Sequence, residues 1–259
     1  MPAIIPVPAF RDNYIWVLRH GSRAVVVDPG DAAPVLAHLD AERLALDAVL
    51  VTHHHADHAG GVAALVDRFP VPVLGPSGET IPCRTRALGD GESVRLPAVA
   101  ASLSVLTVPG HTRGHIAYAG TVGDESVVFC GDTLFAGGCG RLFEGTPAQM
   151  HASLARLAAL PGDTLVHCAH EYTLANLRFA LAVEPGNPAL HARIARDRAR
   201  RDRGEPTLPS RLDEELATNP FLRAGVPEVR DAAARRAGRA LRDDVEVFAE
   251  LRAWKDVFS

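Results

Sequence analysis

Cysteine is scarce in this sequence of 259 residues. There are only four, widely separated and with no Cys-x-x-Cys pair: Cys83, Cys130, Cys139 and Cys168. This spacing excludes a disulfide framework and a cysteine-rich zinc module. We therefore expect reduced, mostly buried thiols, as is usual for a cytoplasmic protein.

The chain also lacks the features of a membrane or nucleic-acid-binding protein. Its first ten residues, MPAIIPVPAF, have no basic segment and no apolar run long enough for a signal peptide or a membrane span. The formal net charge is -4, so an overall basic field is absent. The densest basic stretch, residues 193–203, is interrupted by aspartates, and we expect it to form a solvated helix face rather than a nucleic-acid arm.

What the chain does contain is a series of short apolar runs, broken by Gly and Pro, up to about residue 170. These runs predict strands at 13–19, 23–30, 46–55, 71–76, 103–111, 116–120, 126–132 and 163–170. Helical periodicity lies between several of them, at 33–42, 60–69 and 147–160. A layered α/β domain over residues 1–173 is expected.

After about residue 172 the strand signals stop and helical periodicity takes over. Residues 219–223, NPFLR, form a Pro-containing break between helical segments. We expect a smaller all-helical domain over residues 174–259.

The stretch VTHHHADHAGG, residues 51–61, follows the apolar run LDAVLV. In an extended strand end, side chains alternate, so His53 and His55 should point one way and His54 the other. Asp57 and His58 fall on the first turn of the next helix and can face back toward them. Three imidazoles and a carboxylate around one volume suit Zn²⁺ or Fe, whereas the alternative is a surface histidine turn.

Three more predicted strands end in a side chain that can bind a metal: His111 in PGHTRGH, Asp132 in CGD and His170 in HEY. Strand ends of one α/β layer can converge on a single edge, where such folds place their sites. His115 and His167 lie near these residues but are offset, which favours hydrogen bonding or packing for both.

These motifs are similar to those of the metallo-β-lactamase superfamily. Within it, the chain resembles the hydroxyacylglutathione hydrolases, the glyoxalase II enzymes, over nearly its whole length. The closer resemblance lies in FRDNYIWVL (10–18), GDTLFAGGCGRLFEGT (131–146), HEYTLANLRFA (170–180), NPFLR and LRAWKDVF (251–258). It implies an α/β fold, a four-layer αββα sandwich with a smaller helical C-terminal domain that binds glutathione.

The resemblance further implies two divalent metal ions, zinc first, with iron or manganese as alternatives. One ion would be held by His53, His55 and His111, the other by Asp57, His58 and His170, with Asp132 as the bridge. The glutathione part would be bound by Arg141, Phe143, Tyr172, Arg252 and Lys255. Phe143 departs from the family pattern, since some members have tyrosine there, and Ala169 stands where glycine is usual.

The implied activity is hydrolysis of S-D-lactoylglutathione to D-lactate and glutathione by a cytoplasmic monomer, the second step of methylglyoxal detoxification. Asp57 would orient the attacking hydroxide, and the thiol leaving group, with a pKa of about 8.5, needs no strong protein acid. Two alternatives stay open at this stage: a glutathione persulfide dioxygenase with a single iron, and an RNase Z-like nuclease.

Overall fold

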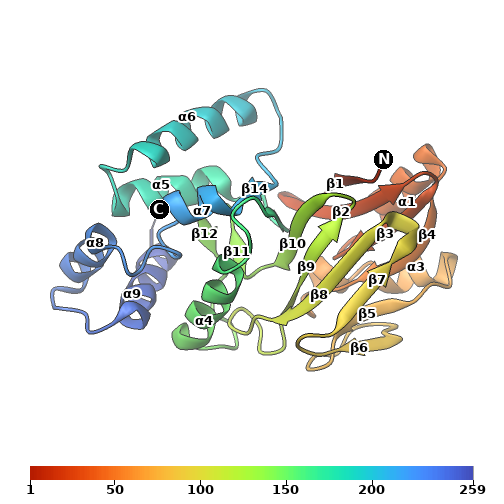
Figure 1. Ribbon diagram of the computed structural model, residues 1–259, viewed down its shortest axis with the longest axis horizontal. Helices are drawn as coiled ribbons and strands as arrows, with labels where there is room; N and C mark the ends of the chain where they lie inside the picture. The colour runs from red at the N-terminus through yellow and green to blue at the C-terminus, as the bar shows by residue number, and fades with distance from the viewer. Residues whose placement is uncertain (259) are drawn as a thin grey trace. The chain divides into compact units, whose positions relative to one another are not determined.

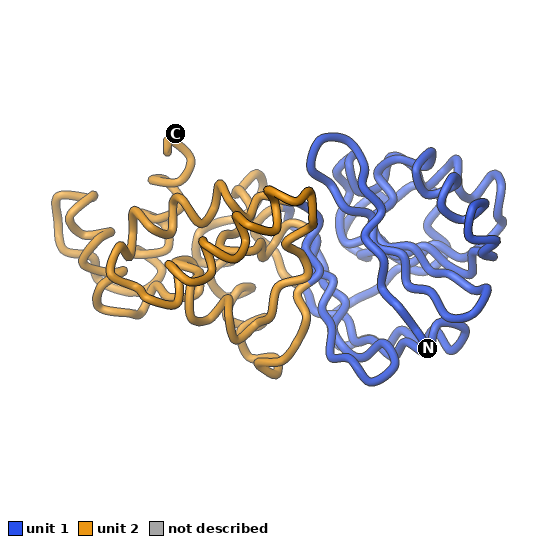
Figure 2. The backbone as a smooth tube through the Cα atoms, turned by 90° about the horizontal axis from the view of Figure 1, so that it is seen from above, with its two compact units in different colours: residues 1–107, 112–131, 167–170 blue, residues 108–111, 132–166, 171–259 orange. Residues whose placement is uncertain are grey.

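A computed structural model of the chain (Figure 1) describes residues 1–258, which form two compact units. The first unit comprises Met1–Thr107, Thr112–Gly131 and His167–His170. The second comprises Val108–His111, Asp132–Val166 and the chain from Glu171 onward (Figure 2). The units alternate along the sequence, whereas the predicted domains were continuous; the predicted boundary at residue 173 stays a prediction.

The first unit contains a six-stranded sheet in the order β1-β2-β3-β4-β5-β6. Its strands are β1 (Ala3–Ala9), β2 (Asn13–His20), β3 (Arg23–Val27), β4 (Ala45–Leu50), β5 (Val73–Pro76) and β6 (Arg86–Leu88). The first three pair antiparallel and the rest parallel. Crossover helices connect two of the three parallel pairs: α1 (Ala32–Glu42) joins β3 to β4, and α3 (Val62–Arg68) lies between β4 and β5. Both helices share one apolar core with this sheet.

A second sheet contains β7 (Ser93–Leu96), β8 (Ala101–Thr107), β9 (Ile116–Val122) and β10 (Glu125–Gly131). β13 (Leu165–Cys168) borders β10, and the short β14 (Ser210–Arg211) pairs with the start of β13. The fully buried Tyr118 on β9 donates hydrogen bonds to the carbonyls of Val51 (2.9 Å) and Leu74 (3.2 Å), in and beside the first sheet. The two sheets therefore face each other, and the α/β sandwich is confirmed.

The second unit is mostly helical. It contains α4 (Pro147–Ala158), α5 (Thr173–Val183), α6 (Pro188–Asp202), α7 (Leu212–Thr218), α8 (Pro227–Ala237), α9 (Asp244–Asp256) and a small hairpin of β11 (Leu134–Phe135) and β12 (Gly138–Cys139). Helix α4 begins at a capping box between Thr146 and Gln149. Aromatic rings form the core between α5, α9 and the NPFLR segment: Phe179 lies 5.8 Å from Phe221 and 5.4 Å from Trp254.

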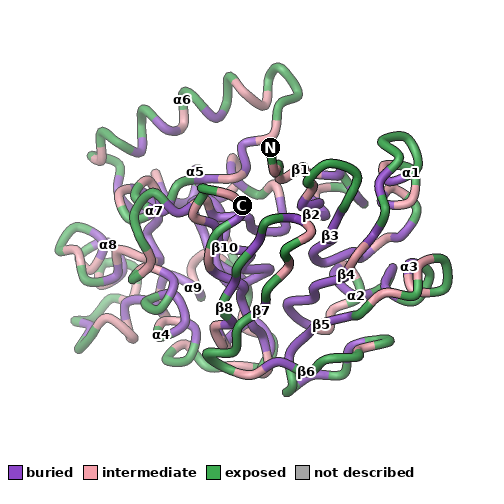
Figure 3. Tube along the Cα trace, turned by 45° about the vertical axis from the view of Figure 1, so that its right-hand side comes forward, coloured by how far each residue is buried: buried purple, intermediate pink, exposed green. Residues whose placement is uncertain are grey.

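The expectation for residues 193–203 is only partly correct. Helix α6 is exposed along most of its length (Figure 3). However, Arg193 and Asp197 are buried, and Arg193 pairs with the buried Glu215 of α7 at 2.6 Å. The inward face of the helix thus includes charged residues beside Leu190, and hydrophobic periodicity does not detect them.

Several smaller expectations need correction. The first strand, β1, was not predicted, because two prolines interrupt its apolar run. Strand β4 ends at Leu50, so residues 51–55 form a loop and not a strand end.

Among the described residues, no helix is both long and apolar enough to cross a bilayer. None of the four cysteines forms a disulfide within residues 1–258, and three of them are buried while Cys83 is exposed.

Candidate active site

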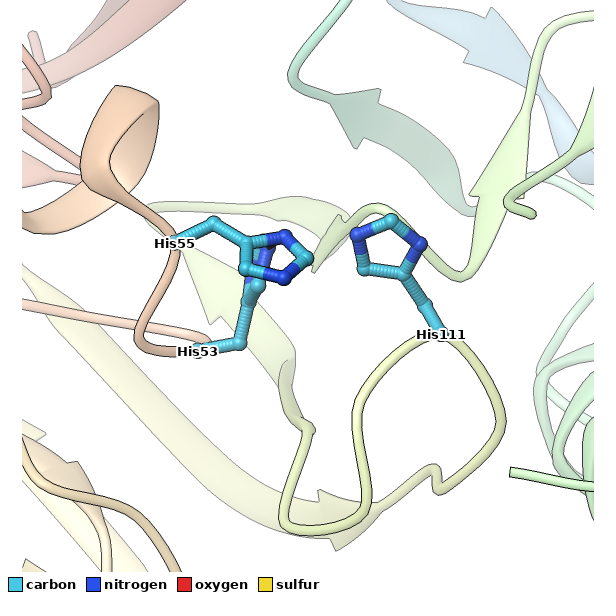
Figure 4. Close-up of side chains that lie close together, drawn as sticks. All are labelled: His53, His55 and His111. Carbon is cyan, nitrogen blue, oxygen red and sulfur yellow. Dashed lines mark hydrogen bonds between the residues drawn. The ribbon is translucent and has the colours of Figure 1, made fainter. Parts of the chain in front are cut away.

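His53 and His55 lie in the loop that follows β4 (Figure 4). His53 is fully buried, and its Nε2 atom lies 3.2 Å from Nδ1 of His55. The other ring nitrogen of His53 lies 3.1 Å from the hydroxyl of Thr52. Two nitrogens that face each other at this distance suit two ligands of a single ion.

A second group in the same unit comprises Asp57, His58 and His170, whose donor atoms lie within 4.8 Å of one another. Oδ2 of Asp57 lies 3.6 Å from Nε2 of His58 and 3.4 Å from Nε2 of His170. Asp57 and His58 come from the short helix α2 (Ala56–Ala59), as expected. His170 follows β13 and forms an isolated bridge with Asn13 at the start of β2.

Two further carboxylates hold the outer nitrogens of these histidines. Oδ2 of Asp28 lies 3.0 Å from Nδ1 of His58, and Oδ1 of Asp12 lies 2.8 Å from Nδ1 of His170. Carboxylates in this position fix the tautomer and ring orientation of metal-bound histidines. Asp28 also accepts hydrogen bonds from the backbone N–H and the hydroxyl of Thr52, both at 2.7 Å.

Sequence reasoning missed both carboxylates. Asp28 ends the strand VVVDPG, the same signal that identified Asp132, so it could have been found. Its backbone has a left-handed φ of 53°, which is uncommon outside glycine and costs conformational energy. Asp12 lies in the hairpin turn between β1 and β2, where polar residues are ordinary, and carried no such signal.

The three histidines that we expected not to bind a metal have other contacts. His54 lies with Nδ1 2.9 Å from Oε2 of Glu79. His115 is buried and stacks on the ring of His53, with centroids 4.5 Å apart. His167 packs edge-on against Trp16, with centroids 4.7 Å apart. The contacts of His115 and His167 agree with the packing interpretation.

The second unit contains the other two predicted ligands. Nε2 of His111 lies 3.4 Å from Oδ2 of Asp132, and Nδ1 of His111 lies 2.9 Å from the backbone carbonyl of Arg141. Gly140 allows this close approach, because a Cβ atom there would lie 1.9 Å from the carbonyl oxygen of Asp132 and 3.2 Å from Nδ1 of His111.

A cavity of about 460 Å³ in the second unit begins at this pair. It brings together His111, Asp132 and all five residues predicted to bind glutathione: Arg141, Phe143, Tyr172, Arg252 and Lys255. Phe143 is 63% exposed and lies edge-on to the ring of His111, with centroids 5.2 Å apart. The cavity wall therefore carries two groups that can bind a metal ion, His111 and Asp132, and three cationic side chains, Arg141, Arg252 and Lys255.

Arg252 and Lys255 both lie on α9, three residues apart, and share the face that lines the cavity, as expected. Arg252 is 6% exposed rather than free at a helix end. Its guanidinium donates to the carbonyl of Cys139 at 2.9 Å and to Asp256 at 3.0 Å. Its Nε atom is buried and has no hydrogen-bond partner among the described residues.

Lys255 is the only lysine in the sequence. Its pKa is lowered, first by partial burial and then by the positive charges of Arg252, Arg178 and Arg141, although Asp256 opposes this. Burial also raises the pKa of the Cys139 thiol to about 11, against the opposing effect of Arg252. The cavity wall is thus rich in positive charge that is only partly neutralised.

The donor atoms fit divalent metal ions. Two nitrogen or oxygen donors bound to one tetrahedral Zn²⁺ at about 2.0–2.1 Å lie about 3.3 Å apart. Within each unit the facing donors are 3.2 to 3.6 Å apart. All are imidazole or carboxylate groups, which suit Zn²⁺, Fe and Mn²⁺.

Comparison with known proteins agrees with this chemistry. A family model described as the metallo-beta-lactamase superfamily matches residues 9–170, and one described as the hydroxyacylglutathione hydrolase C-terminus matches residues 171–258. A hydroxyacylglutathione hydrolase of Cupriavidus taiwanensis is 56% identical over 266 aligned positions, covering 100% of both chains. This chain belongs to the hydroxyacylglutathione hydrolase family.

One solved structure with the same fold is ETHE1 from Myxococcus xanthus, which is 25% identical with a TM-score of 0.65. The match covers 100% of the present chain and 91% of the ETHE1 chain. The protein TTHA1623, solved in a di-iron-bound form, is 34% identical with a TM-score of 0.54, covering 64% of the hydrolase chain and 91% of its own.

The dioxygenase and nuclease alternatives are not favoured for this family member. The match to the hydrolase C-terminus extends from residue 171 to residue 258. Moreover, several arginines of the basic stretch are in ion pairs: Arg193 with Glu215, Arg196 with Glu214, and Arg203 with Glu205.

Proposed function

We propose that this chain hydrolyses S-2-hydroxyacylglutathione thioesters, converting S-D-lactoylglutathione and water to D-lactate and glutathione. The observation that carries the proposal is the cavity of the second unit, which joins His111 and Asp132 to Arg141, Arg252 and Lys255. The substrate has a matching polarity, since its thioester needs activation and its glutathione carboxylates need cations.

We also propose two metal ions per chain, with zinc first and iron or manganese as alternatives. His53, His55 and His111 would hold one ion, Asp57, His58 and His170 the other, and Asp132 would bridge them. The spacing of the donors within each unit supports this, as does the di-iron form of the relative TTHA1623. When bound, such ions lower the pKa of a shared water and polarise the thioester carbonyl.

The chain's own residues would orient the reactants. Oδ2 of Asp57 accepts a hydrogen bond from the side-chain amide of Asn13 at 3.2 Å, which limits its rotation and suits it to orient the attacking hydroxide. Arg141, Arg252 and Lys255 would hold the glutathione part. The departing thiolate has an ordinary thiol pKa of about 8.5, so it leaves without a strong protein acid.

Arg252 would contribute its positive charge and the Nη–H groups that it does not already donate to Cys139 and Asp256. Tyr172, 37% exposed on the cavity wall, would offer a hydroxyl. Phe143, which has no hydroxyl, would act as an apolar wall beside His111.

The setting we propose is the cytoplasm and the second step of methylglyoxal detoxification, with the chain acting as a monomer. Glutathione is a thiol of reducing compartments, and four cysteines without a disulfide among the described residues fit such a compartment.

The decisive experiment is an assay of S-D-lactoylglutathione hydrolysis together with metal analysis of the same sample. We expect thiol release and about two metal ions per chain. Asp132→Ala should lower kcat by at least about 10²-fold and reduce the bound metal. Oxygen consumption with glutathione persulfide, and no thioester hydrolysis, would instead support the dioxygenase. Two retained ions and near-normal turnover in Asp132→Ala would contradict the bridging assignment.

A further inference from the structure

One buried carboxylate outside the proposed ligand set accepts four hydrogen bonds from residues that lie close in sequence to proposed ligands. Glu79 lies in the loop between β5 and β6, and its side chain is only 3% exposed. Oε2 accepts hydrogen bonds from the backbone N–H of His54 (2.6 Å) and from Nδ1 of the same residue (2.9 Å). Oε1 accepts hydrogen bonds from the hydroxyl of Thr112 and from the backbone N–H of Gly114 (3.1 Å).

Each oxygen therefore serves a different segment of the chain. His54 lies between the proposed ligands His53 and His55. Thr112 directly follows the proposed ligand His111 in the sequence, and Gly114 precedes His115, whose ring stacks on that of His53. The two oxygens of Glu79 join the segment at residues 53–55 to the segment at residues 112–115.

The loop that carries Glu79 is itself held in place. Arg84 donates through Nη1 to the carbonyl of Glu79 at 2.6 Å and also to the carbonyl of Pro76. On the other side the packing leaves no space, because a Cβ atom at Gly114 would lie 2.5 Å from Cγ of Glu79. The carboxylate is thus fixed at both its backbone and its side chain.

We propose that Glu79 is a positioning residue for the metal centre: by joining these two segments it sets the affinity of the site for its ions. The proposal rests on the proposed metal-dependent function. Its chemistry is specific to a carboxylate. An ionised carboxylate is an acceptor at both oxygens, whereas an amide offers one acceptor and one donor. Whichever way a glutamine side chain is turned, its NH₂ group would face the N–H or O–H donors of one segment.

The test compares Glu79→Gln with Glu92→Gln. Glu92 is a matched control in the same unit: it accepts a hydrogen bond from the backbone N–H of Gly89 at 2.6 Å and pairs with Arg86, but these groups are exposed. Zn²⁺ affinity is measured by competition with a chromophoric chelator, and the stability of the metal-free protein by thermal unfolding. Loss of groups that orient ligands typically costs about 10–100-fold in metal affinity. We expect a loss in that range for Glu79→Gln and none for Glu92→Gln.

Thr112→Val and Thr112→Ser provide a second pair in case Glu79→Gln does not fold. Valine removes one donor to Oε1 while keeping the shape, and serine restores the hydroxyl. We expect Thr112→Val to weaken Zn²⁺ binding by about threefold or more, as the loss of one hydrogen bond suggests, and Thr112→Ser to bind almost normally.

Kinetics separate positioning from a purely structural role. At saturating metal, Glu79→Gln should recover most of its kcat, with KM for the thioester unchanged. Unchanged Zn²⁺ affinity in either Glu79→Gln or Thr112→Val, or an equal loss in Glu92→Gln, overturns the proposal. If the unaltered protein binds metal and hydrolyses the thioester, these outcomes concern Glu79 alone; if it does neither, it is the proposed function that fails.

Discussion

The histidines of residues 53–58 differ in what lies beside their second ring nitrogen. For His58 it is the carboxylate of Asp28, and for His53 the hydroxyl of Thr52. His54 instead directs Nδ1 to Glu79 and has no place in the proposed ligand set. Neighbouring residues of one type therefore have different predicted effects on metal binding.

We predict that His53→Ala and His55→Ala each lose bound metal, whereas His54→Ala retains both ions and most activity. The backbone N–H of His54 remains in that variant and keeps its hydrogen bond to Glu79. Metal content and kcat of the three variants, purified alike, check this. Equal damage in all three variants would mean that His54 is a ligand or that its side chain is essential to the loop.

Lys255 gives a prediction for kinetics. Contacts far from the reacting carbonyl hold substrate and transition state about equally, so their loss raises KM and leaves kcat nearly intact. A charge-assisted hydrogen bond is worth roughly 1.5–3 kcal/mol, so Lys255→Met should raise KM by about 10-fold or more. Steady-state kinetics at low and high salt provide the measurement. A fall confined to kcat would remove Lys255 from the glutathione site.

Arg252→Ala is a less clean variant, because the guanidinium also holds the carbonyl of Cys139 and packs over the ring of Phe221 at 5.2 Å. We therefore expect it to lower thermal stability as well as to raise KM. The two cationic residues looked equivalent in the sequence but differ in burial.

The lowered pKa of Lys255 predicts a pH dependence. The charged form is lost as pH rises through that pKa, so KM should rise at a pH below the ordinary lysine value of 10.5. Lys255→Arg should keep a low KM and lose this dependence, because arginine stays charged. Folding stability responds in the opposite sense, because the pKa of Lys255 is higher in the unfolded chain than in the folded one. The contribution of Lys255 to stability therefore improves as pH rises from its lowered folded-state pKa toward 10.5. A flat KM profile for the unaltered protein would contradict the assignment.

Among the secondary-structure elements, those with plain periodicity were predicted well and those with interrupted patterns were not. Strands β2, β9 and β10 match their apolar runs within a few residues. β1 was missed because prolines break its run. Residues 51–55 were taken for the end of a strand because no Gly or Pro separates them from the apolar run of β4.

The proposed ligands stay a prediction, but the structure shows which of them lie together within each unit. Every proposed ligand lies in a group of facing donors within its own unit, because the motif residues come just after strand ends or at helix starts. What could not be predicted were the partners from distant segments, Asp12, Asp28 and Glu79. A single acidic residue in a loop has no pattern of its own, and its role depends on the tertiary fold.

Helices α6 and α7 provide a prediction about stability. Arg193 of α6 is buried against Glu215, which also accepts a hydrogen bond from the backbone N–H of Gly137 at 2.8 Å. Removing one partner of a buried pair leaves a buried charge uncompensated and typically costs about 3–5 kcal/mol. We expect a loss of that order in the free energy of unfolding for Arg193→Met.

The matched control is Arg203→Met, at the end of the same helix. Arg203 pairs with Glu205 at 2.7 Å and both side chains are about half exposed, and surface pairs of this kind contribute little to stability. Denaturant unfolding of both variants gives the comparison. A similar small loss in both would show that the buried pair is replaceable by an apolar side chain.

For the whole molecule, the proposed ligands come from both units, five from the first and His111 and Asp132 from the second. An ion that binds only the folded chain stabilises it, by about 2.7 kcal/mol at a free concentration 100 times the Kd. For a chain of this size that corresponds to a rise in Tm of about 5–10 °C. Metal removal by a chelator should lower Tm by that order, reversibly.

Asp132→Ala is the control for this measurement, since its Tm should depend much less on the chelator. A Tm of the unaltered protein that is the same with and without metal would mean that the ions do not bind the folded chain selectively.

The single lysine has a practical consequence. Amine-selective reagents can attach to this protein only at the chain terminus and at Lys255, and Lys255 lies in the wall of the cavity. Its lowered pKa leaves more of it in the reactive neutral form at a given pH. Immobilising the protein through its amines, or coupling a dye to them, would therefore place the adduct where the glutathione part is proposed to bind.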